Sequence, residues 1–228
     1  MNGKRTMIGI SILALLAVVA VSPLLAQRNS WNGSIEAVLQ DIEPGTLSSE
    51  EAAGILLMRQ EEKLARDVYL TLYEKWNIPV FANIAASEES HMDSMELLIE
   101  RYGLEDPVAD ESRANRGTYA NEGFEELYAE LTERGLSSYT AALEVGALIE
   151  DLDIADLQKL IDGSGNDDVR VVYQNLLKGS RNHMRAFARQ LQRFGQEYTP
   201  EYISISDYRS IIGSRNEAGV ISDPHFSF

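Results

Sequence analysis

The chain has 228 residues, of which 20 are basic, 36 are acidic and none is cysteine, and its net charge is −16. With 44% hydrophobic residues it can form one or two domains with a buried core, and its negative charge disfavours direct binding to nucleic acid. The lack of cysteine excludes disulfides, zinc–thiolate sites, iron–sulfur clusters and thiol nucleophiles, so a bound metal needs carboxylate, imidazole, phenol or carbonyl ligands.

Residues 1–26 have the order of a secretory signal peptide. Two basic residues near the start precede an apolar run over residues 7–21, then Pro23, and Ala26 stands before the polar Gln27. We expect cleavage after Ala26, and the alternative is an uncleaved N-terminal anchor, which would be the only membrane contact of the chain. Either interpretation places the rest of the chain outside the cytoplasm, secreted or in the cell envelope.

The next segment, residues 27–49, is polar and is predicted to be an N-terminal linker. A serine at position 48 or 49, followed by Glu51, is typical of a helix start and predicts a first long helix over residues 50–76. An Asn-Ile-Pro sequence ends that helix, and a second long helix is predicted over residues 80–102, before Gly103.

A long connection follows, with a short amphipathic helix predicted over residues 122–134. Two further long helices are predicted over residues 138–161 and 167–194, separated by a glycine-containing break. The short, long and short connections predict an all-α fold, a four-helix bundle over residues 50–202 made of two antiparallel helix pairs joined by a crossover. Residues 203–228 are predicted to be a C-terminal tail over the bundle.

Each long helix has an apolar stripe at core spacing, and a polar residue interrupts every stripe near its middle. Buried carboxylates and imidazoles are costly unless they are paired, neutralised or bound to metal, and four interruptions together indicate a shared site. The interruption on the second helix consists of two residues, three apart, which can bind one ion together. The interrupting residues are Glu62, Glu88 with His91, Glu150 and His183.

Several alternatives remain open from the residues alone. Glu61 is a weaker rival to Glu62, and Glu150 is preferred to Glu144, which lies at a different height and on another side of its helix. Tyr69 is either a core residue, which we favour, or a neighbour of the site. The histidines and glutamates could also form buried ion pairs with a purely structural role.

Four segments carry a resemblance to a known superfamily: EEKLARDVY, IAASEESHM, ALEVGALIEDLDIADL and GSRNHMRAF. They resemble the ferritin-like di-iron carboxylate superfamily, which includes rubrerythrin and bacterioferritin, and within it a poorly characterised prokaryotic family of unknown function. In that superfamily the second and fourth helices each carry Glu-x-x-His, and the first and third helices each carry one Glu. The resemblance implies a set of metal ligands consisting of Glu62, Glu88, His91, Glu150 and His183.

One position departs from the superfamily pattern. Ser180 stands where the second Glu-x-x-His would have its glutamate. The missing carboxylate is either supplied from elsewhere, for example by Glu144 or Asp151, or absent, which would leave an asymmetric pair of ions or a single ion.

The resemblance implies a metalloprotein that binds iron, with two ions as one arrangement and manganese or zinc as alternative metals, and the N-terminal segment implies that it is extracytoplasmic. Its expected chemistry is oxidation of Fe(II) by dioxygen or peroxide, so it is a candidate non-haem iron oxidase or peroxidase. The alternative is a non-catalytic binding or scaffold bundle with a degenerate metal site. Turnover, redox partner and oligomeric state stay open, and nothing in the sequence indicates a 24-subunit cage.

Overall fold

The computed structural model describes residues 35–108 and 113–228, and these two ranges are helical with no strand. The all-α class predicted from the sequence is therefore confirmed. No helix within the described ranges is long and apolar enough to cross a membrane. The predicted signal peptide or anchor, residues 1–26, lies outside the described residues.

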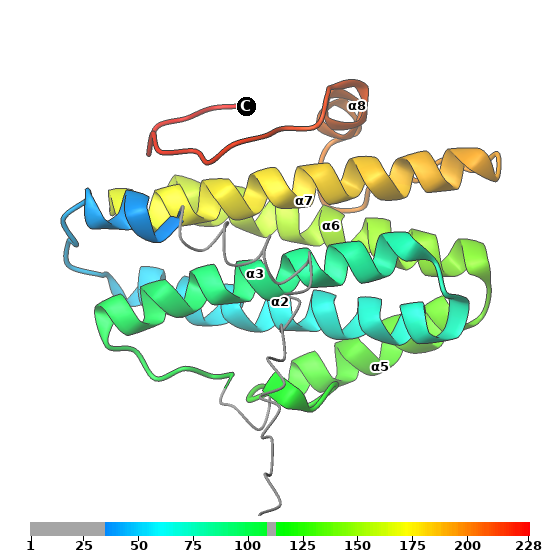
Figure 1. The fold of residues 1–228 in the computed structure, drawn as a ribbon, viewed down its shortest axis with the longest axis horizontal. Helices are drawn as coiled ribbons and strands as arrows, with labels where there is room; N and C mark the ends of the chain where they lie inside the picture. Colours follow the sequence, from blue (N-terminus) through cyan, green and yellow to red (C-terminus); the bar gives the residue numbers. More distant parts are fainter. Residues whose placement is uncertain (1–34, 109–112) are drawn as a thin grey trace, which may run out of the picture.

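Four long helices run side by side along the length of the molecule (Figure 1). They are α2 (Ser49–Trp76), α3 (Pro79–Tyr102), α6 (Tyr139–Gly163) and α7 (Asp167–Arg193). The main contacts are between α2 and α3 and between α6 and α7, and α2 also contacts α6 while α3 contacts α7. The predicted helix ranges and the pairing of neighbours are thus confirmed, whereas the finer assignment to a ferritin-like bundle stays a prediction.

The connection between α3 and α6 contains α5 (Glu122–Leu136), which packs on α2 and α6. Upstream of α5 this connection is held by buried ion pairs on the outer side of α2. Asp67, with no exposed surface, accepts hydrogen bonds from Lys63 at 2.5 Å, from Arg66 at 2.8 Å and from the Tyr119 hydroxyl at 3.1 Å. The Tyr119 hydroxyl, together with the Arg113 and Asn115 carbonyls that accept from Arg66 at 2.7 Å and Lys63 at 3.1 Å, ties the long connection to the middle of α2.

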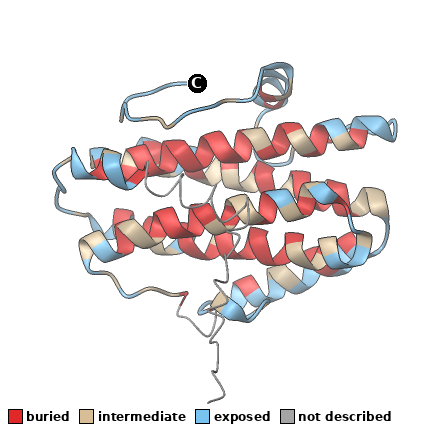
Figure 2. Cartoon of the chain, in the orientation of Figure 1, coloured by how far each residue is buried: buried red, intermediate tan, exposed pale blue. Residues whose placement is uncertain are grey.

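The structure adds two helical segments that the sequence analysis does not predict as helices. Residues 35–40 are helical, and this part of the predicted linker contributes Ile35 and Leu39 to the core. The predicted tail contains α8 (Ile205–Gly213), whose first turn is capped by Ser204 through a hydrogen bond from the Asp207 backbone at 3.1 Å. Figure 2 shows the buried residues concentrated in the long helices, while the tail is mostly exposed.

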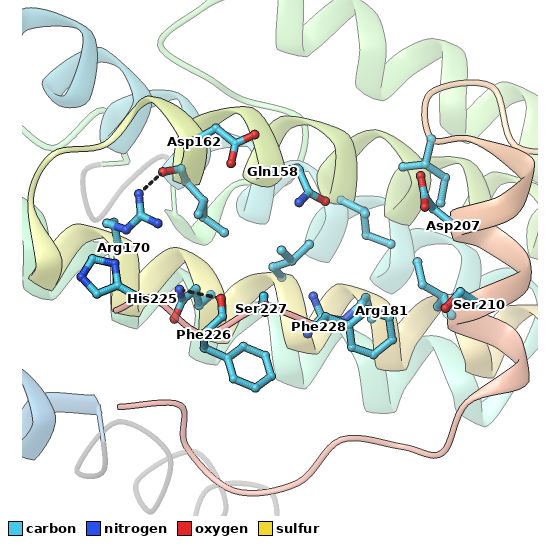
Figure 3. A pocket seen from close by; sticks show the side chains of 16 residues that line it. Gln158, Asp162, Arg170, Arg181, Asp207, Ser210, His225, Phe226, Ser227 and Phe228 are labelled. Carbon is cyan, nitrogen blue, oxygen red and sulfur yellow. Dashed lines mark hydrogen bonds between the residues drawn. The ribbon is translucent and has the colours of Figure 1, made fainter. Parts of the chain in front are cut away.

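The end of the tail lies against α7 and closes a cavity of about 420 Å³ between α6, α7 and α8 (Figure 3). The Pro224 carbonyl accepts hydrogen bonds from Arg170 at 3.0 Å and from Gln174 at 2.8 Å. The Arg181 guanidinium lies 4.3 Å from the centre of the Phe228 ring. None of the residues that line this cavity is a predicted metal ligand.

The N-terminus of α2 is joined to the loop between α6 and α7 by one carboxylate. Glu51 forms a capping box with Ser48, and its other oxygen accepts from the Ser164 hydroxyl at 2.8 Å and from the Gly165 and Asn166 backbone amides at 2.9 and 3.1 Å. Burial alone would raise the pKa of Glu51, but these hydrogen bonds outweigh it and lower the pKa to about 2.

Glu51→Gln is therefore expected to lower the free energy of unfolding by about 1–3 kcal/mol at neutral pH. A carboxylate with a lowered folded-state pKa stabilises the fold above its unfolded pKa of 4.5, and this contribution is lost as the pH falls towards 2. Urea unfolding of both proteins across this range should show the difference shrinking with acidification. The exposed neighbour Glu50, changed to Gln, is the control and should have little effect; a pH-independent deficit in Glu51→Gln would contradict this account.

Candidate metal centre

The five predicted ligands meet between the four long helices. Glu62 comes from α2, Glu88 and His91 from α3, Glu150 from α6 and His183 from α7. The first four are 2% exposed and His183 is 7% exposed. The polar interruptions of the four apolar stripes therefore lie at one height and in one place.

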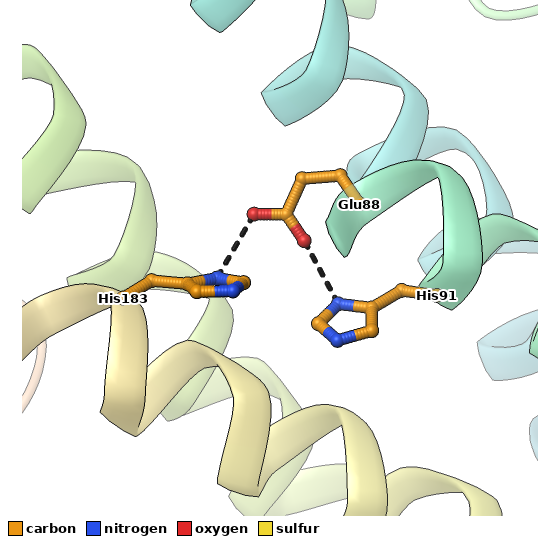
Figure 4. Close-up of side chains that lie close together, drawn as sticks. All are labelled: Glu88, His91 and His183. Atoms are coloured by element: carbon orange, nitrogen blue, oxygen red, sulfur yellow. Dashed lines mark ion pairs between the residues drawn. The ribbon is translucent and has the colours of Figure 1, made fainter. Parts of the chain in front are cut away.

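Glu88 is at the centre of this group and uses its two oxygens in different directions (Figure 4). Its Oε2 lies 2.8 Å from Nδ1 of His91, and its Oε1 lies 3.0 Å from Nδ1 of His183. The two imidazole rings are stacked with centroids 5.5 Å apart. One carboxylate thus joins two imidazoles from two different helices.

Each imidazole also faces a second carboxylate. Nδ1 of His91 lies 3.2 Å from Oε2 of Glu62, and Nδ1 of His183 lies 3.3 Å from Oε2 of Glu150. We call Glu62, His91 and Glu88 Oε2 the His91 half, and Glu150, His183 and Glu88 Oε1 the His183 half. The two halves have the same donor set and share Glu88.

The charges of this group compensate one another only in part. Burial raises the pKa of Glu62 to about 7, in spite of the nearby His91. Burial would also raise the pKa of Glu88, but His183 and His91 outweigh it and lower the pKa to about 2. Burial would lower the pKa of His91, and Glu62 and Glu88 raise it to about 9. Opposed pKa shifts of this kind occur at functional sites and also in buried structural ion-pair networks.

One oxygen of the group is left over, which supports binding of a cation. Oε1 of Glu62 is buried and has no hydrogen-bond partner among the described residues. Nδ1 of His183, in contrast, lies within ion-pair distance of Glu88 and Glu150. Leaving a buried polar atom unsatisfied costs about 1–3 kcal/mol, and a metal ion would remove that cost. One ligand atom each of Glu88, His91 and His183 lies within 4.8 Å of the other two, close enough to hold one ion.

Neighbouring side chains orient the candidate ligands. The Tyr69 hydroxyl donates to Oε1 of Glu150 at 2.5 Å, and Ser87 Oγ lies 2.9 Å from Nε2 of His183. Tyr69 is fully buried beside Phe81 and Phe187, so it is a core residue as we expected and also a neighbour of the site, which we did not favour. Such hydrogen bonds hold a metal ligand in one orientation.

The structure places neither Glu144 nor Asp151 next to the histidines, and it does not bring Glu61, the alternative to Glu62, to them either. Glu144 has a side chain 40% exposed that faces Arg134 at 3.9 Å. Asp151 is buried, but its carboxylate accepts hydrogen bonds from the tail, including the Tyr198 hydroxyl at 2.8 Å and the Ile203 amide at 2.9 Å. Glu61 lines a cavity next to the site, and its ionic neighbours are other carboxylates and Lys159 rather than the histidines.

The sequence analysis missed Asp153. This residue lies one turn after Glu150 on α6, and its Oδ2 accepts a hydrogen bond from the Ser180 hydroxyl on α7. Burial, together with Glu62 and Glu150, raises its pKa well above its ordinary value. The Glu-x-x-Asp spacing of residues 150 and 153 puts both on one helix face, and this was the signal that could have identified Asp153.

Residues 51–215 match the family described as an uncharacterized protein domain, DUF2202, and this match covers all five candidate ligands. The chain is 55% identical over 174 residues to the uncharacterized protein MJ0754 of Methanocaldococcus jannaschii, covering 76% of this chain and 92% of that protein. It is also similar to the crystal structure of the hypothetical protein MJ0754 from Methanococcus jannaschii, with a TM-score of 0.75, 53% identity and coverage of 77% of this chain and 99% of that one.

Gly179 allows α7 to approach the His91 ring. A Cβ atom at this position would lie 2.4 Å from Cε1 and Nε2 of His91, and the ring is buried among Glu62, Glu88 and His183. Replacing a helical glycine by alanine normally stabilises a helix by about 0.5–1 kcal/mol. Here we expect Gly179→Ala to lower the free energy of unfolding by about 1–3 kcal/mol, because the buried ring has to move.

Denaturant unfolding of the metal-free protein measures this effect. Gly163→Ala in α6 is the matched control, because a Cβ there meets nothing within 4 Å. A Gly179→Ala variant at least as stable as the unchanged protein would show that the contact with His91 is not a constraint.

Proposed function

This chain belongs to the DUF2202 family, and we propose that it is an extracytoplasmic ferritin-like metalloprotein that binds iron between its four long helices. The observation that carries the proposal is the position of Glu88 between two imidazoles, each of which faces a further carboxylate. A carboxylate whose two oxygens each face one half of the centre is suited to link two ions. Manganese and zinc are the alternative metals, because they also accept mixed carboxylate and imidazole ligands.

The arrangement of the helices supports the ferritin-like part of the proposal. Two pairs of neighbours in sequence, α2 with α3 and α6 with α7, are connected through a crossover that carries α5. Ferritin-like bundles have one such long crossover and place metal ligands on the inner faces of all four helices. Here each long helix contributes at least one of the five candidate ligands.

Bound iron would supply the electrons for reduction of dioxygen or peroxide, with oxidation of Fe(II) to Fe(III). The residues of this chain would bind and orient it. Glu88 would connect the two halves, and Tyr69 would hold Glu150 by its hydrogen bond. Phe81 and Phe187 pack on the Tyr69 ring and exclude water from that side of the site.

The location outside the cytoplasm rests on residues 1–26 alone, with their basic start, apolar run and Ala26 before Gln27. Mass spectrometry of the protein recovered from cells that express the full chain tests it. A mature chain that begins at Gln27 supports export with cleavage, and a full-length chain in the cytoplasmic fraction contradicts it.

A structural role for the same residues is the second candidate function. It is favoured by the ion pairs themselves, because His91 and His183 contact Glu62, Glu88 and Glu150 without any metal. Buried ion pairs are weak stabilisers in general, since desolvation cancels most of the Coulombic gain. Metal binding distinguishes the two candidates.

We expect the purified, untagged chain to bind about two iron ions after loading with Fe(II), as ferritin-like di-iron proteins do. His183→Ala should reduce the metal content, because it removes one of the two nitrogen donors. His225→Ala should leave the content unchanged, because His225 is 73% exposed in the tail and lies 4.0 Å from Asp167. Inductively coupled plasma mass spectrometry of the three proteins measures the effect.

Circular dichroism of His183→Ala shows whether the variant keeps its helix content, so that a loss of bound metal can be distinguished from unfolding. Absence of bound metal in the unchanged protein would exclude the metalloprotein and leave the structural role. A second measurement follows the rate of Fe(II) oxidation in air. If iron binds but oxidation is no faster than in buffer, the centre stores or senses metal without turnover.

A further inference from the structure

We propose that Asp153 is a metal ligand shared by both halves of the centre, and that it supplies from α6 the carboxylate that α7 lacks at Ser180. The inference rests on the proposed function, because it needs a metal in the site. It goes beyond that function by adding a ligand that the superfamily pattern does not place on this helix. Ser180 then has a role as the residue that positions Asp153.

The facing helices bring Asp153 to the position of the missing side chain. Asp153 follows Glu150 by three residues on α6, and Ser180 precedes His183 by three residues on α7. The two pairs are one helical turn long, and α6 and α7 are packed neighbours. The Ser180 hydroxyl donates to Oδ2 of Asp153, so the carboxylate and the site of the absent glutamate are in direct contact.

Asp153 also shares a cavity with the ligands of both halves. This cavity has a volume of about 70 Å³ and is lined by Glu62 of the His91 half, by Glu150 of the His183 half and by the shared Glu88. The Oε1 atom of Glu62, on a side chain 2% exposed, has no hydrogen-bond partner among the described residues. An unsatisfied buried oxygen in the wall of the cavity indicates that a cation belongs next to it.

A fourth carboxylate would balance the charge of a two-ion centre. Two divalent ions carry four positive charges, whereas Glu62, Glu88 and Glu150 supply three negative charges. A net charge in a site this deeply buried would be costly. With Asp153 the candidate ligands become four carboxylates and two imidazoles, which is the composition of di-iron carboxylate sites. The carboxylates are distributed differently over the helices, because the fourth comes from α6 and not from α7.

Other acidic residues do not fit this role. Glu144 and Asp151 are engaged elsewhere, as described above. Glu61 lines the same cavity and its Oε2 has no hydrogen-bond partner among the described residues, but it lies on α2, and the Ser180 hydroxyl donates to Asp153 instead. Asp153 is the carboxylate that combines the cavity, the contact with Ser180 and the helix face of Glu150.

Anaerobic calorimetric titration with Fe(II), and separately with Zn(II), tests the inference in four proteins. In Asp153→Asn we expect the second ion to bind at least about tenfold more weakly, or not at all. Asp156→Asn is the control, because Asp156 lies one turn further on α6, is paired with Lys159 at 2.7 Å and does not line the cavity. The double variant Asp153→Ala/Ser180→Glu returns the carboxylate to α7 and should recover the second ion relative to Asp153→Asn.

Thermal unfolding without metal provides a readout of folding. We expect metal-free Asp153→Asn to be at least as stable as the unchanged protein, because it removes one of several crowded carboxylates, and to gain less stability from added metal. The inference is overturned if the unchanged protein and Asp153→Asn both bind two ions with equal affinity, or if the unchanged protein binds one ion only. If the unchanged protein binds no metal, the proposed function itself fails.

Discussion

The placement of Glu88 between two imidazoles is the constraint on which the rest of the structure depends. Its two oxygens reach His91 on its own helix and His183 on α7, so α3 and α7 must hold one fixed height and spacing. Small residues make that spacing possible, since the Cβ of an alanine at position 179 would collide with the His91 ring. Close packing in the interior leaves little room to relax such a contact. The polar centre therefore specifies how the helices assemble as much as the apolar stripes do.

The molecule separates two kinds of buried charge. On α2, the basic residues Lys63 and Arg66 pair with Asp67 and also donate hydrogen bonds to backbone carbonyls of the crossover. In the centre, the glutamates are paired with imidazoles, which can give up a proton and bind a metal instead. A lysine or arginine would neutralise the central carboxylates permanently. Imidazoles neutralise them reversibly, because they can lose a proton near neutral pH.

Much of the fold could be predicted from the sequence because its signals are local. Ser48 with Glu51, and Gly103 after the second helix, are end signals that depend on a few neighbouring residues, and the helices begin and end within about two residues of the predicted positions. The candidate ligands could be predicted because a glutamate or histidine in an apolar stripe is visible without knowing its partners. The signal for α8 was also local, in Ser204 and Asp207, but the segment lacks a long apolar stripe.

The parts that could not be predicted depend on the rotation and height of one helix relative to another. The spacing from Glu150 places Asp153 on the same helix face, but the contact of that face with Ser180, and of Asp151 with the tail, depends on how the segments pack. Reading α7 alone, Ser180 indicates a lost ligand and a degenerate site. A metal ion, however, responds to the position and charge of an oxygen and not to the helix that carries it. The contact between Ser180 on α7 and Asp153 on α6 joins two helices, and a motif counted along one helix cannot register it.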